Sequence, residues 1–262
     1  MTERIKANGI DVNYKLEGPV GAPVLMLRNS LLTDYGMWDF QVSTFTKHYR
    51  LLRYDTRGHG GTQSTSGRYS MDMLVADVIG LVDALDIAKF HFLGLSMGGM
   101  IAQLLASKHG DRLLSVSLCN TACHLGPAAM WDDRIRMAED KGIGAFVQPM
   151  KERWLTQEYR DKNPEFLEKL GSIISKTSVA GFVGCAYALR DMDLLPILPN
   201  IKIPTLIVAG EQDIATPVSA SEVLHQEIKG SRLVVIKQAG HLPNIEQTQS
   251  FDRTVLEFLG AH

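Results

Sequence analysis

The sequence has few cysteines, an odd number of them and no zinc-like spacing between them. Its 262 residues contain 3 Cys, which is too few for a disulfide framework in a chain of this size. Cys119, Cys123 and Cys185 have mainly apolar neighbours, so we expect buried free thiols. Their spacing does not match a structural zinc site, and no metal is expected.

The sequence also lacks an excess of charge of one sign and a long hydrophobic run. The 27 Lys and Arg nearly balance the 29 Asp and Glu, giving a net charge of −2, so no nucleic-acid or membrane-surface partner is expected. The longest stretch without these four residue types, 113–131, is too polar for the roughly 20 apolar residues of a membrane span. Residues 1–9 lack the apolar run of a secretory signal, so we expect a cytoplasmic protein. A homo-oligomer is a possible assembly on this sequence.

Short runs rich in Val, Ile, Leu and Phe recur along the chain and predict buried strands. They are residues 24–27, 51–54, 90–95, 114–118, 205–209 and 233–236. Several are separated by segments of helical period, clearest at 71–85, where Ser70 is the expected N-cap. This alternation predicts an α/β fold, a mostly parallel sheet with helices on both faces. In such folds ligands bind at the carboxyl ends of the strands.

The alternation stops between residues 123 and 199, where the pattern is helical and no strand is convincing. Sheet periodicity resumes at Ile203. We therefore expect one core domain, formed by 1–122 and 200–262, with 123–199 inserted in it as a helical lid, or cap. Such an insertion typically shapes the substrate pocket and excludes water.

The strongest chemical signal is Gly94-Leu95-Ser96-Met97-Gly98, which fits G-x-S-x-G between an apolar strand and a helix-like run. A nucleophilic serine at such a place sits on a sharp turn, where small neighbours prevent collisions between Cβ atoms. The helix N-terminus beneath it directs N–H groups toward a developing oxyanion. Taken alone, the motif also fits a tight turn capped by a serine.

Two later residues favour the catalytic interpretation. Asp213 and His241 each follow a predicted strand, and the order Ser96, Asp213, His241 is typical of α/β-hydrolases. His241 would act as the general base, and Asp213 would fix its tautomer and stabilise its cation. Glu211 is the rival acid. His59 precedes the nucleophile, and we expect it to stabilise a turn instead.

An oxyanion hole needs two N–H donors. Met97, directly after the nucleophile, is the first by its position. The second should follow the strand at 24–27, and we assign it to Leu31, with Leu32 as the alternative. The side chains of Leu31 and Leu32 would also serve as pocket walls.

With these residues in place, the chain resembles the α/β-hydrolase superfamily and, within it, the bacterial 3-oxoadipate enol-lactonases. The likeness runs through 29–31, 37–39, 52–60, 94–99, 118–122, 131–135, 152–154, 188–193 and 241–247. Most α/β-hydrolases carry His-Gly where this chain has Asn29-Ser30, and the enol-lactonases share that substitution. The chain departs from the pattern at Arg28, where a small residue is usual, at Leu32, where Gly is expected, and at Thr62, where Ser is common.

The resemblance implies that a small-molecule lactone or ester is the substrate. For the enol-lactonases, Ser96 would open a carboxymethyl-bearing five-membered enol-lactone to 3-oxoadipate through an acyl-enzyme, without a cofactor. The substrate carboxylate suggests a cation in the pocket. Arg134, one helical turn after Trp131, could share a face with it. The alternatives are a solvated Arg134 paired with Asp132 or Asp133, and a Trp131 that is plain lid core.

Other functions stay open on the same fold. A carboxylesterase, an acyl-homoserine lactonase or a hydrolase of ring-cleavage products would use the same three residues. Perhydrolase or haloperoxidase side activity uses them too. An alternative from another class is a ligand-sensing receptor with a slow triad. A non-catalytic scaffold does not account well for three reactive residues that each follow a separate strand.

Overall fold

An eight-stranded sheet with the order β1-β2-β4-β3-β5-β6-β7-β8 forms the centre of the computed structural model, which describes residues 3–262. The start of the segment 1–9, considered above for a leader, lies outside the described residues. The strands are β1 (Glu3–Ala7), β2 (Ile10–Glu17), β3 (Val24–Arg28), β4 (Arg50–Tyr54), β5 (Phe90–Leu95), β6 (Leu113–Cys119), β7 (Thr205–Gly210) and β8 (Arg232–Ile236). The pairs from β4 through β3 to β8 are parallel, which confirms the predicted mostly parallel sheet.

The antiparallel edge of the sheet was not predicted. Strands β1 and β2 form a hairpin, and β2 pairs antiparallel with β4. The turn consists of Asn8 and Gly9, with φ of 46° and 77°, which are the positive values that a two-residue hairpin turn needs. The dipeptide Asn-Gly was therefore the overlooked signal.

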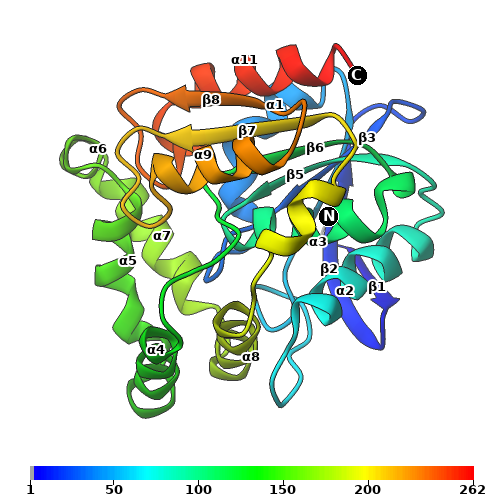
Figure 1. Cartoon of the computed structure of the whole chain (residues 1–262). Helices are drawn as coiled ribbons and strands as arrows, with labels where there is room; N and C mark the ends of the chain where they lie inside the picture. The colour runs from blue at the N-terminus through cyan, green and yellow to red at the C-terminus, as the bar shows by residue number, and fades with distance from the viewer. Residues whose placement is uncertain (1–2) are drawn as a thin grey trace.

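Helices cover both faces of the sheet, as predicted (Figure 1). Helices α1 and α11 pack together on one face, and α2, α3 and α9 lie on the other. Their bounds are α1 (Asp39–Phe45), α2 (Met71–Ala84), α3 (Met97–Lys108), α9 (Val218–Glu227), α10 (Pro243–Glu246) and α11 (Thr248–Leu259). Short 3₁₀ helices are η1 (Tyr35–Trp38), η2 (Gly110–Arg112), η3 (Ile143–Phe146) and η4 (Leu195–Asn200).

Helix α2 follows directly from its sequence pattern. The Ser70 side chain accepts a hydrogen bond from the Met73 N–H at 3.1 Å, which satisfies one of the free donors of the first turn. Leu74, Val78 and Leu81 recur at helical spacing, and all three are fully buried. The predicted helix and its N-cap are therefore confirmed.

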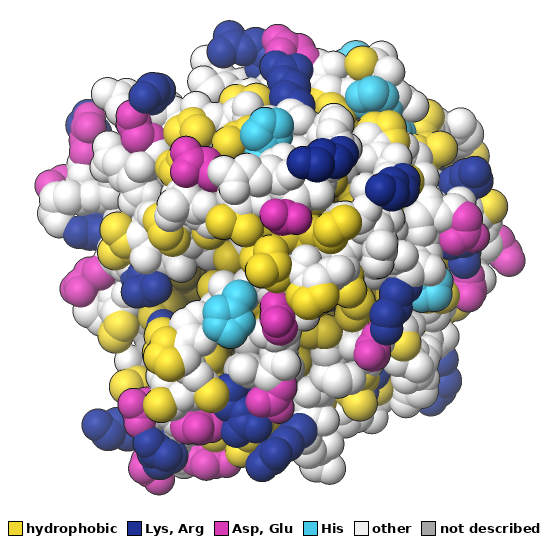
Figure 2. Space-filling model, viewed as in Figure 1, with side chains coloured by type: hydrophobic (Ala, Val, Ile, Leu, Met, Phe, Trp, Pro, Cys, Tyr) yellow, Lys and Arg dark blue, Asp and Glu magenta, His cyan; other side chains and the backbone are white. Residues whose placement is uncertain are grey.

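Between β6 and β7 the described chain contains helices and no strand. They are α4 (Ala128–Lys141), α5 (Val147–Trp154), α6 (Gln157–Lys162), α7 (Pro164–Ser175) and α8 (Val179–Arg190). We call residues 123–199 the helical segment. It lies beside the carboxyl ends of the strands (Figure 1), and charged side chains of both signs gather over α4 (Figure 2).

The thiols, the candidate metal ligands and the helix lengths bear on three further expectations from the sequence. Cys119, Cys123 and Cys185 are free and buried, as predicted. Within residues 3–262, no group of three or more His, Cys, Asp or Glu side chains could hold a metal ion. In the same residues no single helix is long and apolar enough to cross a membrane, although α7 and α8 together, bent by 88°, reach the required length and composition.

Candidate active site

Ser96 occupies a strained turn between β5 and α3. Its φ of 57° and ψ of −116° are rare for a residue with a side chain. A Cβ at Gly94 would come within 2.2 Å of the Gly98 carbonyl oxygen, and one at Gly98 within 2.4 Å of the Arg28 carbonyl oxygen. Only glycine fits at either place. The turn therefore has the geometry that the motif predicts for a nucleophile.

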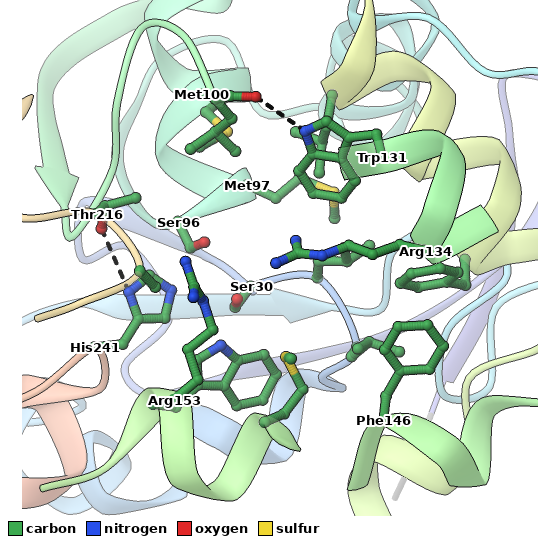
Figure 3. A pocket seen from close by; sticks show the side chains of 18 residues that line it. Ser30, Ser96, Met97, Met100, Trp131, Arg134, Phe146, Arg153, Thr216 and His241 are labelled. Atoms are coloured by element: carbon green, nitrogen blue, oxygen red, sulfur yellow. Dashed lines mark hydrogen bonds between the residues drawn. The ribbon is translucent and has the colours of Figure 1, made fainter. Parts of the chain in front are cut away.

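Asp213 and His241 lie together at the ends of β7 and β8. The distance between His241 Nδ1 and Asp213 Oδ2 is 2.8 Å, and both side chains are buried. Figure 3 shows the His241 ring and the Ser96 hydroxyl facing the same pocket. The structure thus brings together the three residues predicted as a triad.

Several donors hold Asp213 as an anion. Asp213 Oδ1 accepts the Ala215 and Thr216 N–H groups at 2.7 and 3.1 Å, and Oδ2 accepts Thr216 Oγ1 at 2.7 Å and Asn120 Nδ2 at 2.8 Å. Burial acts to raise the pKa of Asp213. The charge of His241 and these hydrogen bonds overcome it and lower the pKa to about 2. The carboxylate is therefore ionised at neutral pH.

Asn120 and Thr216 support the Asp213–His241 pair, and sequence reasoning did not assign them this role. Asn120 follows β6 and also donates to the Gly240 carbonyl at 3.1 Å. Thr216 Oγ1 lies 3.4 Å from His241 Nδ1 (Figure 3). The position of Asn120 directly after a strand was a signal that could have identified it.

The turn after β3 presents the first candidate oxyanion donor. The Thr33 N–H bonds to the Ser30 carbonyl at 3.4 Å, and Leu32, with φ of 65°, is the third residue of that turn. This is a conformation that glycine usually supplies, which explains why Gly was expected there. Within residues 3–262 the Leu31 N–H has no hydrogen-bond partner.

The second candidate donor is the first residue of α3. The Met97 N–H belongs to the first helical turn, whose donors have no partner within the helix. Met97 and Leu31 both line the pocket that Ser96 faces. Two residues from different elements, each with an N–H that has no hydrogen-bond partner among residues 3–262, therefore line the pocket with Ser96, and their role as oxyanion donors stays a prediction.

The Asn29-Ser30 pair fixes the start of the same turn. Asn29 Nδ2 donates to the Tyr54 carbonyl at 2.9 Å, and Asn29 Oδ1 accepts from Trp38 Nε1 at 3.1 Å. Arg28 is also buried, with its guanidinium 4.8 Å from the centre of the Tyr54 ring and donating to Thr56 Oγ1. Arg28 is therefore an interior residue beside the turn, and not a pocket wall.

The pocket lies between the sheet edge and the helical segment, and its roughly 550 Å³ of empty space is partly open to solvent. Its walls are mainly apolar, with two arginines among them. The lining residues are Ser30, Leu31, Leu32, Ser96, Met97, Met100, Leu125, Trp131, Arg134, Phe146, Met150, Arg153, Trp154, Phe182, Leu189, Ala215, Thr216 and His241. Such a cavity suits a small, partly apolar ligand.

Arg134 is a pocket residue, as one of the two sequence hypotheses holds. Its guanidinium lies 4.8 Å from the centre of the Trp131 ring. The rival hypothesis, pairing with a neighbouring acid, is wrong because Asp132 pairs with Arg190 and Asp133 with Arg136. Trp131 is buried and donates to the Leu125 carbonyl at 3.0 Å, so it belongs both to the core of the helical segment and to the pocket wall.

Sequence reasoning missed Arg153. Figure 3 shows its guanidinium and that of Arg134 reaching into the pocket toward Ser96. Burial, followed by the charge of Arg153, lowers the pKa of Arg134. Among residues 3–262 neither arginine has a carboxylate partner within 4.0 Å. The pocket therefore carries uncompensated positive charge, which an anionic ligand would balance.

The rival candidates lie elsewhere. Glu211 is exposed and bonds to Lys237 Nζ at 2.6 Å and to the Gln238 N–H at 3.1 Å. His59 is fully buried, and its N–H closes a turn on the Thr56 carbonyl at 2.8 Å. Burial lowers the pKa of His59 to about 4. The expected turn-stabilising position of His59 is thus observed.

Comparison with known proteins agrees with this geometry. Residues 23–182 match a family model described as alpha/beta hydrolase fold, and residues 174–261 match one described as TAP-like protein. A 3-oxoadipate enol-lactonase 2 of Acinetobacter baylyi is 36% identical over 97% of this chain and 94% of its own length.

Two solved structures are similar over nearly their whole length. The enol-lactonase from Burkholderia xenovorans has a TM-score of 0.96 and 38% identity, covering 98% of this chain and 100% of its own. A thermophilic esterase from Thermogutta terrifontis, solved with malate bound, has a TM-score of 0.92 and 29% identity, covering 99% and 98%. These similar proteins thus include enzymes named as a lactonase and as an esterase.

Proposed function

The chain belongs to the α/β-hydrolase family, and we propose that it opens 3-oxoadipate enol-lactone to 3-oxoadipate through an acyl-enzyme on Ser96. One observation carries the proposal: a strained serine, a histidine bonded to a buried aspartate, and two arginines with no carboxylate partner among residues 3–262 come together, with Ser96, His241, Arg134 and Arg153 all lining one pocket. The similarity to enol-lactonases supports the lactone as substrate.

In the first step, the Ser96 oxygen attacks the lactone carbonyl carbon while His241 takes the hydroxyl proton. The carbonyl oxygen becomes an oxyanion, and the Leu31 and Met97 N–H groups bond to it. Asp213 stabilises the imidazolium that forms, and its lowered pKa keeps it charged for that purpose.

In the second step, the oxyanion collapses and the ring carbon–oxygen bond breaks. The leaving group is an enolate, so it needs less acid catalysis than an alkoxide. It takes the proton that His241 holds, which returns the imidazole to its neutral form, and then ketonises. Water then attacks the acyl-enzyme, and His241 takes the proton of that water and returns it to Ser96. The products are 3-oxoadipate and free enzyme.

Substrate selection would come from the helical segment, which we propose acts as a lid. Arg134 and Arg153 would bind the carboxylate of the substrate, and Trp131 and Trp154 would form apolar walls around the ring. Residues of α4 and α5 form part of the pocket wall, and charge–charge attraction beside these apolar walls is stronger than in bulk water.

A second candidate is a carboxylesterase for small carboxylated esters. The similarity to an esterase solved with malate, a dicarboxylate, favours it. The same serine chemistry applies, with an alkoxide or phenolate as the leaving group.

The test is a panel of substrates for the purified protein. We expect kcat/KM of roughly 10⁴ to 10⁸ M⁻¹s⁻¹ on 3-oxoadipate enol-lactone, and values at least about 100-fold lower on homoserine lactones and p-nitrophenyl acetate. A preference for a neutral ester over the enol-lactone would retain the serine mechanism and overturn the proposed substrate.

A further inference from the structure

Glu246 joins the helical segment to the loop that carries His241. Its Oε1 accepts the Gly240 N–H at 2.8 Å. Its Oε2 accepts both the N–H and the hydroxyl of Thr156, at 3.0 and 2.7 Å. One carboxylate therefore binds the residue before His241 on one side and the segment between α5 and α6 on the other.

The same corner contains a direct contact between the helical segment and His241. The His241 N–H donates to the Trp154 carbonyl at 2.8 Å. The Trp154 ring stacks on the His241 imidazole, with centres 6.2 Å apart and planes at 28°. The backbone and the ring of His241 thus both contact Trp154, and Glu246 binds Thr156, two residues further along the chain.

The packing leaves little room for a different arrangement. A Cβ at Gly240 would lie 2.8 Å from the Trp154 carbonyl oxygen and 2.9 Å from Glu246 Oε1. From the other side, Asn120 donates to the Gly240 carbonyl. The loop 239–241 is therefore clamped between the sheet and the helical segment.

We propose that Glu246 is a positioning residue that keeps His241 and the Arg153–Trp154 wall of the pocket in one fixed arrangement. The proposal rests on the general-base role of His241 given above. Without Glu246, the end of α5 and the loop 239–241 would each lose an anchor. The imidazole would then spend less time in line with Ser96, and a misplacement of about 1 Å can lower the rate roughly 100-fold.

The variants follow from the three hydrogen bonds. Glu246→Gln preserves the shape but turns one acceptor into a donor facing an N–H or hydroxyl donor. Thr156→Val removes the hydroxyl bond to Glu246 and also the N-cap bond that Thr156 Oγ1 accepts from the Tyr159 N–H at 3.2 Å, whereas Thr156→Ser retains both. Glu211→Gln is the matched control, because Glu211 also links the loops after β7 and β8 but touches neither Gly240 nor Thr156.

The measurement is kcat and KM on p-nitrophenyl acetate, a neutral ester that needs Ser96 and His241 but no carboxylate contact. We expect Glu246→Gln to lower kcat about 10- to 100-fold with little change in KM. Thr156→Val should lower it a few-fold, and Thr156→Ser and Glu211→Gln should leave it unchanged. Circular dichroism and thermal unfolding of each variant show whether it is folded.

The decisive comparison repeats Glu246→Gln in a His241→Ala background. If Glu246 acts through His241, its substitution has almost no further effect there; a merely structural role would produce the same fold-loss in both backgrounds. Equal losses, or a folded Glu246→Gln with unchanged kcat, would overturn the proposal. A wild-type protein with no Ser96-dependent ester turnover would instead overturn the proposed function, and this role with it.

Discussion

The charges of Asp213 and of the two pocket arginines depend on the groups that surround each side chain. Asp213 is buried, which disfavours its anion, yet the charge and hydrogen bond of His241, with the hydrogen bonds from Thr216 and Asn120, lower its pKa to about 2. The two pocket arginines receive no such compensation. At the residue scale, the sequence predicted the reacting groups but not the supporting contacts of Asn120 and Thr216, because these depend on how the loops fold around Asp213.

Arg134 gives a prediction about substrate recognition. Arg134→Ala should raise KM for the enol-lactone about 10- to 100-fold, because a hydrogen bond to a charged group is worth roughly 1.5–3 kcal/mol. KM for p-nitrophenyl acetate should change less than about threefold. Arg136→Ala is the control, since Arg136 lies on the same helix but pairs with Asp133 on the surface. Equal effects of Arg134→Ala on both substrates would remove Arg134 from carboxylate binding.

Leu32 gives a prediction about backbone strain. Its φ of 65° disfavours any residue with a Cβ, so Leu32→Gly should be more stable than Leu32→Ala by about 1 kcal/mol. Both should be less stable than the wild type, because the buried leucine side chain is lost. Urea unfolding measures the order. At Leu27 in β3, the matched control, Ala should be more stable than Gly; the same order at Leu32 would contradict the account.

At the scale of elements, the predictable features were those with a local physical cause. The turn at Ser96 was predictable because a residue with a Cβ at position 94 or 98 would collide with a neighbouring backbone carbonyl, and the sequence has glycine at both positions. Helix α2 was predictable from its apolar spacing and its Ser70 cap. The β1–β2 hairpin was missed because β1 is short and largely exposed, so it lacks the continuous apolar run that marks a buried strand.

Helix α11 carries a prediction about pH and stability. Burial raises the pKa of Asp252 to about 6, and Gln41 donates to it at 3.1 Å. A raised pKa means that the fold prefers the protonated carboxyl. The contribution of Asp252 to stability is therefore fully present below about pH 4, is lost as the pH rises, and is gone above about pH 6.

Asp252→Asn cannot ionise and retains an oxygen that can accept from Gln41. Relative to the wild type, its free energy of unfolding should rise by about 1 to 3 kcal/mol between pH 4 and pH 8. Denaturant unfolding at the two pH values measures the difference. A difference that does not change with pH would show that Asp252 has the same pKa in the folded and the unfolded protein, and would contradict the raised pKa.

At the scale of the whole molecule, the site is a product of topology. Ser96, Asp213 and His241 follow three different strands, and the parallel arrangement brings their ends to one edge of the sheet. The sequence predicted this convergence because the order of the three residues and the apolar run before each of them can be read directly from the chain. It did not reveal Glu246 or Arg153, since their roles depend on how the helical segment packs against the loops.

The central claim is that Ser96 opens a carboxylated enol-lactone, and one measurement tests it most directly. The kcat/KM of the purified protein on 3-oxoadipate enol-lactone is compared with that of Ser96→Ala, after both are shown to be folded. The account predicts efficient turnover by the wild type and a loss of at least about 10⁴-fold in the variant. Turnover that survives the substitution, or a wild type that leaves the enol-lactone intact, would contradict it.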